Sequence, residues 1–202
     1  MRRGIRWKRC WDYKLMKYYK SLKLKDGRTC ILRNCTAEDG AVVIEVFKLT
    51  HEQTDLMLTY PEEMTFTVEQ EAKFLQDKTD SSDEIEILAE INGKVIGTAG
   101  IGRVGSQEKL KHRAEFGIGI DKEYWGLGIG HALTEACIEC AETAGYAQLE
   151  LGVTAENERA LSLYKSEGFI EFGRNPKGLW SRKSGWQELV LMRRELFGGD
   201  QE

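Results

Sequence analysis

Three glycines alternate with apolar residues at Gly126, Gly128 and Gly130, between an expected strand and an expected amphipathic helix. Because glycine has no Cβ, such a turn exposes backbone N–H groups, and the start of the helix adds positive potential. Helix N-termini of this kind bind phosphate groups. The spacing therefore indicates a phosphate-binding loop, although the same glycines would also permit close packing of the helix against the strand.

A second glycine pattern matches the dinucleotide-binding fingerprint G-x-G-x-x-G at Gly100, Gly102 and Gly105. That fingerprint requires a helix that opens on the last glycines. Only Ser106–Lys111 separates these glycines from the next expected strand, which is too short for a crossover helix. We therefore predict a hairpin connection here. The sequence contains no G-x-x-x-x-G-K-[ST] motif, which excludes a P-loop.

A further set of polar and aromatic residues is spaced around one predicted helix, as Asn157, Ala160, Tyr164 and Gly168-Phe169. Taken alone, Tyr164 could be a core aromatic residue of an amphipathic helix. Together with the upstream glycine loop, the pattern N-x-x-A-x-x-x-Y-x-x-x-G-F resembles the GNAT superfamily of N-acetyltransferases. The resemblance covers roughly residues 28–195 and includes the strand at His112–Asp121, which resembles the fourth strand of that family.

The resemblance implies a fold and a co-substrate. The fold would be a single-domain mixed α/β structure, with a mostly antiparallel sheet of six to seven strands, flanking helices and a splayed cleft between the fourth and fifth strands. The co-substrate would be acetyl-CoA, and no metal is expected. Its binding residues would be Ile118, Gly119, Ile120, Trp125, Gly126, Leu127, Gly128, Ile129, Gly130, His131, Asn157, Ala160, Tyr164 and Lys165.

The implied reaction transfers the acetyl group to an amine by direct attack in a ternary complex. Tyr164 would protonate the departing thiolate or donate a hydrogen bond to it. Because an amine is almost entirely protonated at pH 7, a base should remove its proton, and Glu115 is the main candidate. Glu84 and Glu90 are weaker candidates. The alternative is a non-catalytic regulatory module of the same fold that binds acetyl-CoA.

Trp125 departs from the family pattern, because Gln or Arg usually stands at the head of this loop. An indole has one hydrogen-bond donor and no charge. We therefore expect the phosphates to be held mainly by backbone N–H groups, with help from Lys122, His131 or Lys165, while Trp125 stacks on a neighbouring group.

Charge is distributed unevenly along the 202 residues, whose net charge is −4. Residues 1–25 contain ten Lys and Arg against one acid, whereas the remainder contains 19 basic and 32 acidic residues. An acidic body argues against nucleic acid as a ligand and is compatible with a cationic amine acceptor. The basic N-terminus has no apolar h-region and the chain has no apolar run of about 18 residues, so neither a secretory signal nor stable membrane insertion is expected.

The five cysteines are odd in number and irregularly spaced, which predicts a reduced, cytoplasmic protein with free thiols. Cys137 and Cys140 form a C-x-x-C pair within a predicted helix and are interpreted as small core residues. The amine acceptor is a small molecule or a peptide, and its identity is open. The segments that would shape its pocket, at about residues 36–80 and 174–187, contain no recognisable motif. A homodimer is also left open.

Two regions are expected: a basic N-terminal extension at residues 1–25 and an acetyltransferase domain at residues 26–197. In the extension, Trp7, Trp11, Leu15, Tyr18 and Leu22 have helical spacing. This segment has three possible interpretations: a basic amphipathic helix for a membrane surface or an acidic partner, a loosely packed extension, and a true translation start at Met16.

Hydrophobic periodicity predicts the regular elements of the domain. Strands are expected at Cys30–Asn34, Ile85–Ala89, Val95–Gly102, His112–Asp121, Gln148–Val153, Phe169–Phe172 and Glu188–Met192. Helices are expected after the N-cap Thr36 and at Thr67–Lys78, Ile129–Ala144 and Asn157–Ser166.

Overall fold

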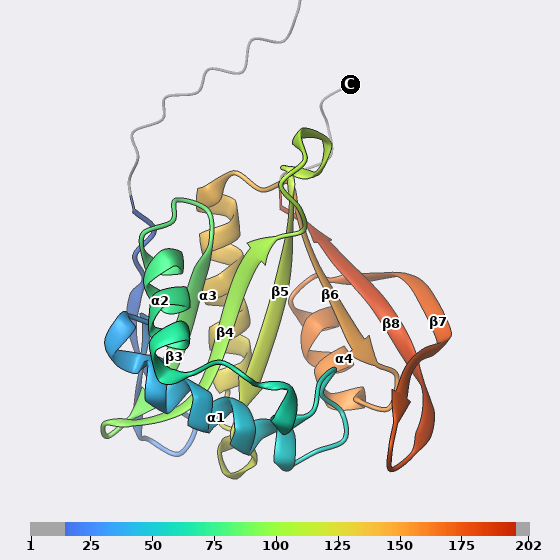
Figure 1. Cartoon of the computed structure of the whole chain (residues 1–202), viewed down its shortest axis with the longest axis horizontal. Helices are drawn as coiled ribbons and strands as arrows, with labels where there is room; N and C mark the ends of the chain where they lie inside the picture. Colours follow the sequence, from blue (N-terminus) through green and yellow to red (C-terminus); the bar gives the residue numbers. More distant parts are fainter. Residues whose placement is uncertain (1–14, 197–202) are drawn as a thin grey trace, which may run out of the picture.

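The structure, a computed structural model, describes residues 15–196, which form an eight-stranded sheet in the order β1-β2-β3-β4-β5-β6-β8-β7 (Figure 1). The strands are β1 (Tyr19–Lys23), β2 (Thr29–Asn34), β3 (Ile85–Ile91), β4 (Lys94–Arg103), β5 (Arg113–Ile120), β6 (Gln148–Thr154), β7 (Ile170–Ser181) and β8 (Gly185–Glu195). The α-helices are α1 (Gly40–Glu52), α2 (Val68–Thr79), α3 (Ile129–Ala144) and α4 (Glu158–Ser166). Every strand pair is antiparallel except β5 with β6.

The mixed, mostly antiparallel α/β architecture confirms the predicted fold class, but the sheet has one strand more than the upper limit of the prediction. The additional strand is β1, which pairs with β2 from Tyr19↔Arg33 to Lys23↔Thr29. The helical interpretation of Tyr18 and Leu22 is therefore wrong. Trp7 and Trp11, also part of that interpretation, lie outside the described residues.

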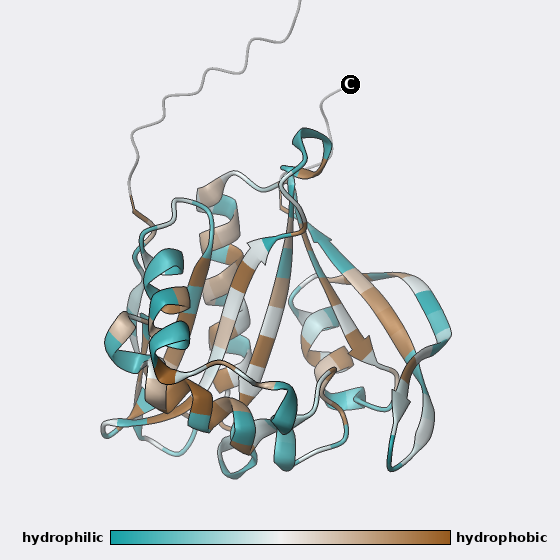
Figure 2. Cartoon of the chain, viewed as in Figure 1, coloured by the Kyte–Doolittle hydropathy of each residue, from teal (hydrophilic) through white to brown (hydrophobic). Residues whose placement is uncertain are grey.

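The helices cover both faces of the sheet. Figure 1 shows α1 and α2 in front of the central strands and α3 behind them, and α3 also contacts α4. Apolar residues concentrate on the strands and on the helix faces turned toward them (Figure 2). This three-layer arrangement buries apolar surface on both sides of the central strands, which stabilises the whole domain.

Local sequence signals determine several turns and helix ends. Asn92 and Gly93 both have positive φ, 51° and 80°, as a two-residue hairpin turn between β3 and β4 requires. Gly105 lies in a hairpin connection between the antiparallel strands β4 and β5, which confirms the exclusion of a dinucleotide fold. The hydroxyl of Thr67 accepts a hydrogen bond from the Gln70 N–H and caps α2.

The parallel pairing of β5 and β6 ends after three residue pairs, of which Glu115↔Glu150 is the last. Beyond it the two strands diverge, as the ribbon in Figure 1 shows. The backbone of β5 from Phe116 to Ile120 is therefore unpaired on the side facing β6. This is the splayed arrangement that the resemblance predicted between the fourth and fifth strands.

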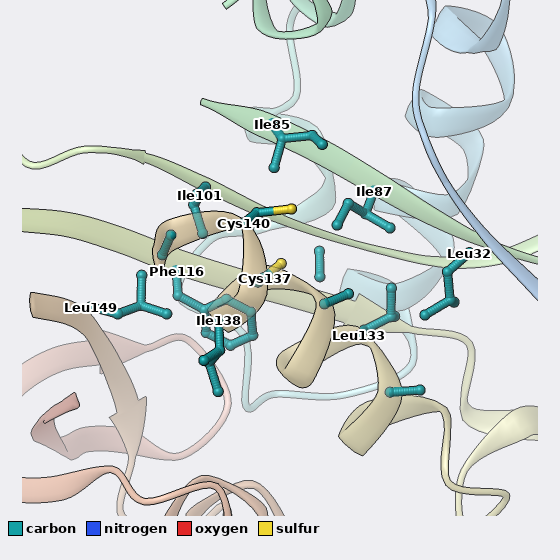
Figure 3. Close-up of a cluster of buried hydrophobic side chains, with 14 of the residues drawn as sticks. Leu32, Ile85, Ile87, Ile101, Phe116, Leu133, Cys137, Ile138, Cys140 and Leu149 are labelled. Atoms are coloured by element: carbon teal, nitrogen blue, oxygen red, sulfur yellow. The ribbon is translucent and has the colours of Figure 1, made fainter. Parts of the chain in front are cut away.

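The larger part of the core lies between α3 and the sheet. Cys137 and Cys140 project from α3 toward the apolar side chains of the strands, among them Ile85 and Ile87 (Figure 3). All four cysteines in the described part of the chain are buried and free. The interpretation of the C-x-x-C pair as small core residues is confirmed. None of the helices within residues 15–196 is long and apolar enough to cross a membrane.

We predict that Leu133→Ala, at a fully buried position on α3, lowers the free energy of unfolding by about 3 kcal/mol, because it removes apolar contacts and leaves a cavity. Urea denaturation followed by circular dichroism would measure the change. Val68→Ala is the control, since Val68 is 48% exposed and should change stability little. Equal effects of the two substitutions would contradict this description of the core.

Candidate active site

Two cavities meet where β5 and β6 diverge. The first has a volume of about 810 Å³ and extends over the glycine loop and the start of α4. The second has a volume of about 530 Å³ and lies over β4, β5 and the end of α1. Both are lined by the same seven residues: Thr50, Leu56, Met57, Ile118, Gly119, Asn157 and Tyr164. A molecule in one cavity can therefore contact a molecule in the other.

The glycine loop forms one end of the first cavity. Gly126 and Gly128 have φ values of 84° and 95°, which residues with a Cβ rarely adopt. Gly128 is the N-cap of α3, so the first N–H groups of this helix, including that of Ile129, have no carbonyl partner within the helix. Since these groups line the cavity, this end is suited to an anion.

The third glycine of the loop has a different role. A Cβ at Gly130 would lie 3.1 Å from Cδ2 of Leu163 on α4, so this glycine allows α3 and α4 to approach each other. A Cβ at Gly128 would meet nothing within 4 Å. Close helix packing therefore explains the glycine at Gly130, whereas the positive φ of the backbone explains the one at Gly128.

The indole ring of Trp125 makes a hydrogen bond to the backbone and stacks on a cation. Its Nε1–H donates a 2.8 Å hydrogen bond to the Ile120 carbonyl, and the Arg159 guanidinium lies over the ring, 4.9 Å from its centroid. Arg159 and Lys25 both line the first cavity beside the loop. These two side chains place positive charge beside the loop, where Trp125 itself has none.

A short network fixes the loop relative to α1. The Gln53 side chain donates to Oδ1 of Asp121 (2.9 Å) and accepts from the Lys122 N–H (2.8 Å). Asp121 is 2% exposed, and hydrogen bonds from Gln53 and from the Glu123 N–H hold its pKa below the usual range. The chain that leads from β5 into the glycine loop is thereby tied to the end of α1.

The open edge of β5 forms the middle of the first cavity, where Ile118, Gly119 and Ile120 line it. The β4–β5 register is regular, with no bulge at Gly117 or Gly119. A Cβ at Gly119 would lie 3.2 Å from Oγ1 of Thr50, whereas one at Gly117 would lie in open space. The lack of a side chain at Gly119 thus allows α1 to pack closely against β5.

Only the oxygen of the Asn157 side-chain amide makes a hydrogen bond within the described part of the chain. Its Oδ1 accepts a 3.2 Å hydrogen bond from the Ala160 N–H and caps α4. Because Asn157 also lines both cavities, its Nδ2 donors are the groups left for a ligand.

Tyr164 is 7% exposed and packs edge-on against Phe116 at a centroid distance of 6.0 Å, with Phe169 at 5.9 Å. Burial raises the pKa of its phenol well above 10. The hydroxyl is therefore protonated at neutral pH and can donate a hydrogen bond. Within residues 15–196 it has no hydrogen-bond partner. The ring belongs to the core and the residue also lines both cavities.

Four acidic, basic or imidazole side chains line the second cavity. Glu115 lines it, and so do the paired Lys78 and Glu86, whose Nζ and Oε2 are 2.9 Å apart. His51 also lines it, stacked on Phe47 with its Nδ1 2.7 Å from the Phe47 carbonyl. Because a carbonyl only accepts, Nδ1 carries a proton and Nε2 is free as an acceptor.

Beside the second cavity, two distant segments are joined around a separate small cavity of about 60 Å³. Asp55, in the loop after α1, accepts hydrogen bonds from the hydroxyls of Ser181 and Ser184 at the tip of the β7–β8 hairpin, at 2.7 Å and 2.8 Å. The Gln187 amide donates to the Asp55 carbonyl at 3.2 Å. The segment at 174–187, expected to help shape the acceptor pocket, is therefore a hairpin bound to the loop after α1, and none of its residues lines the second cavity.

The structure brings most of the predicted cofactor residues to one cavity: Ile118, Gly119, Ile120, Trp125, Gly126, Gly128, Ile129, Gly130, His131, Asn157, Ala160 and Tyr164. Glu115 lines the neighbouring cavity. Leu127 packs against the core, and Lys165 is exposed on α4 outside the cavity lining. Neither Glu84 nor Glu90 lines either cavity; they lie near Arg103 and Arg33 instead.

Sequence reasoning overlooked Arg159, Lys25, His51 and Lys78. Arg159 stands inside the motif between Asn157 and Ala160, so its helical position could have indicated it. Lys25 falls in the segment set aside as an extension, and no local pattern places it beside the loop.

A family model described as the acetyltransferase (GNAT) family matches residues 49–169. The match covers more than half of the chain and contains the glycine loop and Tyr164. The chain belongs to the GNAT family. The resemblance inferred from the two motifs is therefore confirmed.

Two curated relatives illustrate the similarity. The L-amino acid N-acyltransferase MnaT of Escherichia coli is 26% identical over 110 residues, which cover 54% of this chain and 63% of that protein. The N-alpha-acetyltransferase RimI of Mycobacterium tuberculosis is 35% identical over 107 residues, which cover 53% of this chain and 63% of that protein. The chain thus spans less than two thirds of each relative.

Solved GNAT structures have the same fold. An acetyltransferase of Streptococcus pneumoniae gives a TM-score of 0.79 at 27% identity, and the match covers 82% of this chain and 99% of that one. The yncA protein of Salmonella typhimurium, solved with its cofactor acetyl-CoA, gives a TM-score of 0.74 at 19% identity, with coverages of 85% and 96%.

We predict that His51 is neutral at pH 7, because burial lowers its pKa below 6.5. Between the folded pKa and about 6.5 the unfolded chain binds a proton that folded His51 does not, so stability falls as pH drops through this window. NMR titration of the ring would show the lowered pKa, and His51→Asn should reduce the loss of stability between pH 7.5 and 5.5. A ring that titrates above 6.5 would contradict the prediction.

Proposed function

We propose that this protein is an N-acetyltransferase that moves the acetyl group of acetyl-CoA to an amine. The observation that carries the proposal is the meeting of two cavities at Tyr164 and Asn157, where β5 and β6 diverge. One cavity is suited to a long ligand that ends in phosphates, and the other to a smaller acceptor.

In this proposal the phosphates of acetyl-CoA lie over the glycine loop. Backbone N–H groups at the start of α3 would bind them, together with the side chains of Arg159 and Lys25. The pantetheine arm would follow the unpaired backbone of Ile118, Gly119 and Ile120, with Nδ2 of Asn157 as a further donor. The residues present therefore fit both the anionic and the amide-bearing parts of the co-substrate.

The chemical step would take place at the junction of the cavities. The amine nitrogen attacks the thioester carbon, a C–N bond forms, and the C–S bond breaks. Tyr164, which is protonated at neutral pH, donates its proton or a hydrogen bond to the departing thiolate. Glu115, which lines the acceptor cavity, would accept the proton that the amine loses. His51 offers a second acceptor, Nε2, in the same cavity.

The relatives support amine acetylation and differ in the acceptor. MnaT is named for L-amino acids and RimI for α-amino groups. We accordingly propose an acceptor with a primary amine, either free or at the end of a peptide. Acetyl-CoA consumption with an amine panel, followed by thiol release, would test the activity. Binding of acetyl-CoA without any transfer would favour the regulatory module instead.

We predict that Tyr164→Phe lowers kcat about 10- to 100-fold and changes the Kd for acetyl-CoA less than twofold, because the ring packing is kept and only the hydroxyl is lost. Thiol release would give kcat, and calorimetry would give Kd. Phe169→Leu is a control for disturbed packing in the same aromatic cluster. Full activity of Tyr164→Phe would exclude a role as proton donor.

We also predict that Arg159→Gln weakens acetyl-CoA binding about 5- to 10-fold, since it removes a cation that stacks on Trp125 beside the loop. Lys165→Gln, two turns further along α4 and outside the cavity lining, should change the Kd less than twofold. Calorimetry at two salt concentrations would measure both, and the Arg159 effect should shrink at high salt. A larger effect of Lys165→Gln would favour the original assignment of Lys165.

A further inference from the structure

We infer that the acceptor is an amine with no carboxylate next to it, such as the α-amino group of a peptide or a simple alkylamine, rather than a free α-amino acid. This inference rests on the proposed function, because it concerns the acceptor cavity of that site. It is carried by the charges that line the cavity and by the partners those charges already have.

Glycines line part of the acceptor cavity, and the Glu86 carboxylate covers one of them, Gly100. Gly100 and Gly102 on β4 and Gly117 on β5 line it, and β4 and β5 pair so that Gly100 lies opposite Gly117. A Cβ at Gly117 would meet nothing within 4 Å. The open space at Gly117 leaves room for an acceptor beside Glu115 and the Lys78–Glu86 pair, which line the same cavity.

The only cationic side chain on this lining, within residues 15–196, is already paired. Lys78 lies 2.9 Å from Glu86, and both side chains are largely buried, at 14% and 16% exposure. Its Nζ also lies over the Phe74 ring, 5.0 Å from the centroid. The charge of this lysine is therefore compensated within the protein.

The other ionisable groups on the lining do not favour an anion. Glu115 makes no ion pair or hydrogen bond within the described chain, because its neighbour Arg113 binds Glu150 instead. His51 is held as the Nδ1–H tautomer by the Phe47 carbonyl, and burial lowers its pKa, so it adds no positive charge at pH 7. With Lys78 and Glu86 compensating each other, the lining carries one net negative charge.

This charge discriminates between two kinds of amine. In a free α-amino acid the carboxylate is separated from the amine by a single carbon, so both groups would enter the cavity together. The ammonium is attracted to Glu115, but the carboxylate is repelled and finds no unpaired cation. An amide or a hydrogen at that position avoids the repulsion. The apolar residues Phe47, Leu56, Met57 and Leu58, which also line the cavity, favour an acceptor with an apolar side chain.

The Lys78–Glu86 pair depends on a glycine. Glu86 lies opposite Gly100 in the β3–β4 pairing, and a Cβ at Gly100 would overlap Oε2 of Glu86. The Glu86 carboxylate thus lies against the β4 backbone at Gly100, close enough to pair with Lys78. Removing the charge of Glu86 would leave the Lys78 ammonium free to bind an acceptor carboxylate, which makes the inference testable by a gain of binding.

The test compares L-leucinamide, isopentylamine and L-leucine, which have the same side chain and differ only in the group next to the amine. Binding to the protein–CoA complex by calorimetry is the primary readout, and kcat/KM from thiol release is the second. We expect both carboxylate-free amines to bind at least tenfold more tightly than leucine, which corresponds to about 1.4 kcal/mol. Isopentylamine controls for the basicity of the amine, because it lacks both the amide and the carboxylate.

Two variants locate the discrimination. Glu86→Gln and Glu115→Gln should each reduce the preference over leucine about 10-fold, whereas Glu84→Gln, which lies near Arg103 outside the cavity lining, should leave it unchanged. If leucine binds as tightly as the amines, or if neither amine binds, the inference is overturned. If the amines bind preferentially but no acetyl group is transferred, the proposed function fails and the inference about the cavity stands.

Discussion

The early end of the β5–β6 pairing is the constraint on which the site depends. Three residue pairs join the strands, and beyond Glu115 each strand follows a different neighbour. Phe116, Tyr164 and Phe169 pack together near this point, with centroid distances between 5.9 Å and 6.3 Å, and support the open arrangement. The unpaired backbone of β5 and the junction of the two cavities both follow from this divergence.

The features that could be predicted from the sequence are those determined locally. Positive φ at Asn92, Gly93 and Gly128, the cap at Thr67 and the helix that carries Tyr164 all depend on a few adjacent residues. In contrast, β1 consists of five residues with alternating exposure and two lysines, and it becomes a strand only because the edge of β2 is available. Likewise, β7 runs to Ser181 because β8 lies beside it.

The same distinction applies to the site. Asn157, Tyr164 and the glycine loop belong to two short motifs, and spacing was sufficient to find them. Lys25 reaches the loop through the β1–β2 turn, and Lys78 reaches the acceptor cavity from α2; both positions depend on tertiary packing between distant segments. Trp125 was correctly expected to stack on a neighbour, but the neighbour, Arg159, is known only from the fold.

The two cavities have opposite electrostatic character although they share seven lining residues. Around the glycine loop, Lys25, Arg159 and the N-terminus of α3 provide positive potential. Around the second cavity, Glu115 and the compensated Lys78–Glu86 pair leave a negative one. A negative and a positive ligand would therefore each have a preferred side, and their reactive ends would meet between them.

The contact of Asp55 with Ser181 and Ser184 has a consequence for how this domain could diversify. The loop after α1 and the β7–β8 hairpin are separated by more than a hundred residues, yet one carboxylate joins them beside the second cavity. The glycine loop is fixed independently, through Gln53 and Asp121. Mutation and selection could therefore remodel these two segments as a paired module, whose two halves must change together, while the glycine loop remains constant.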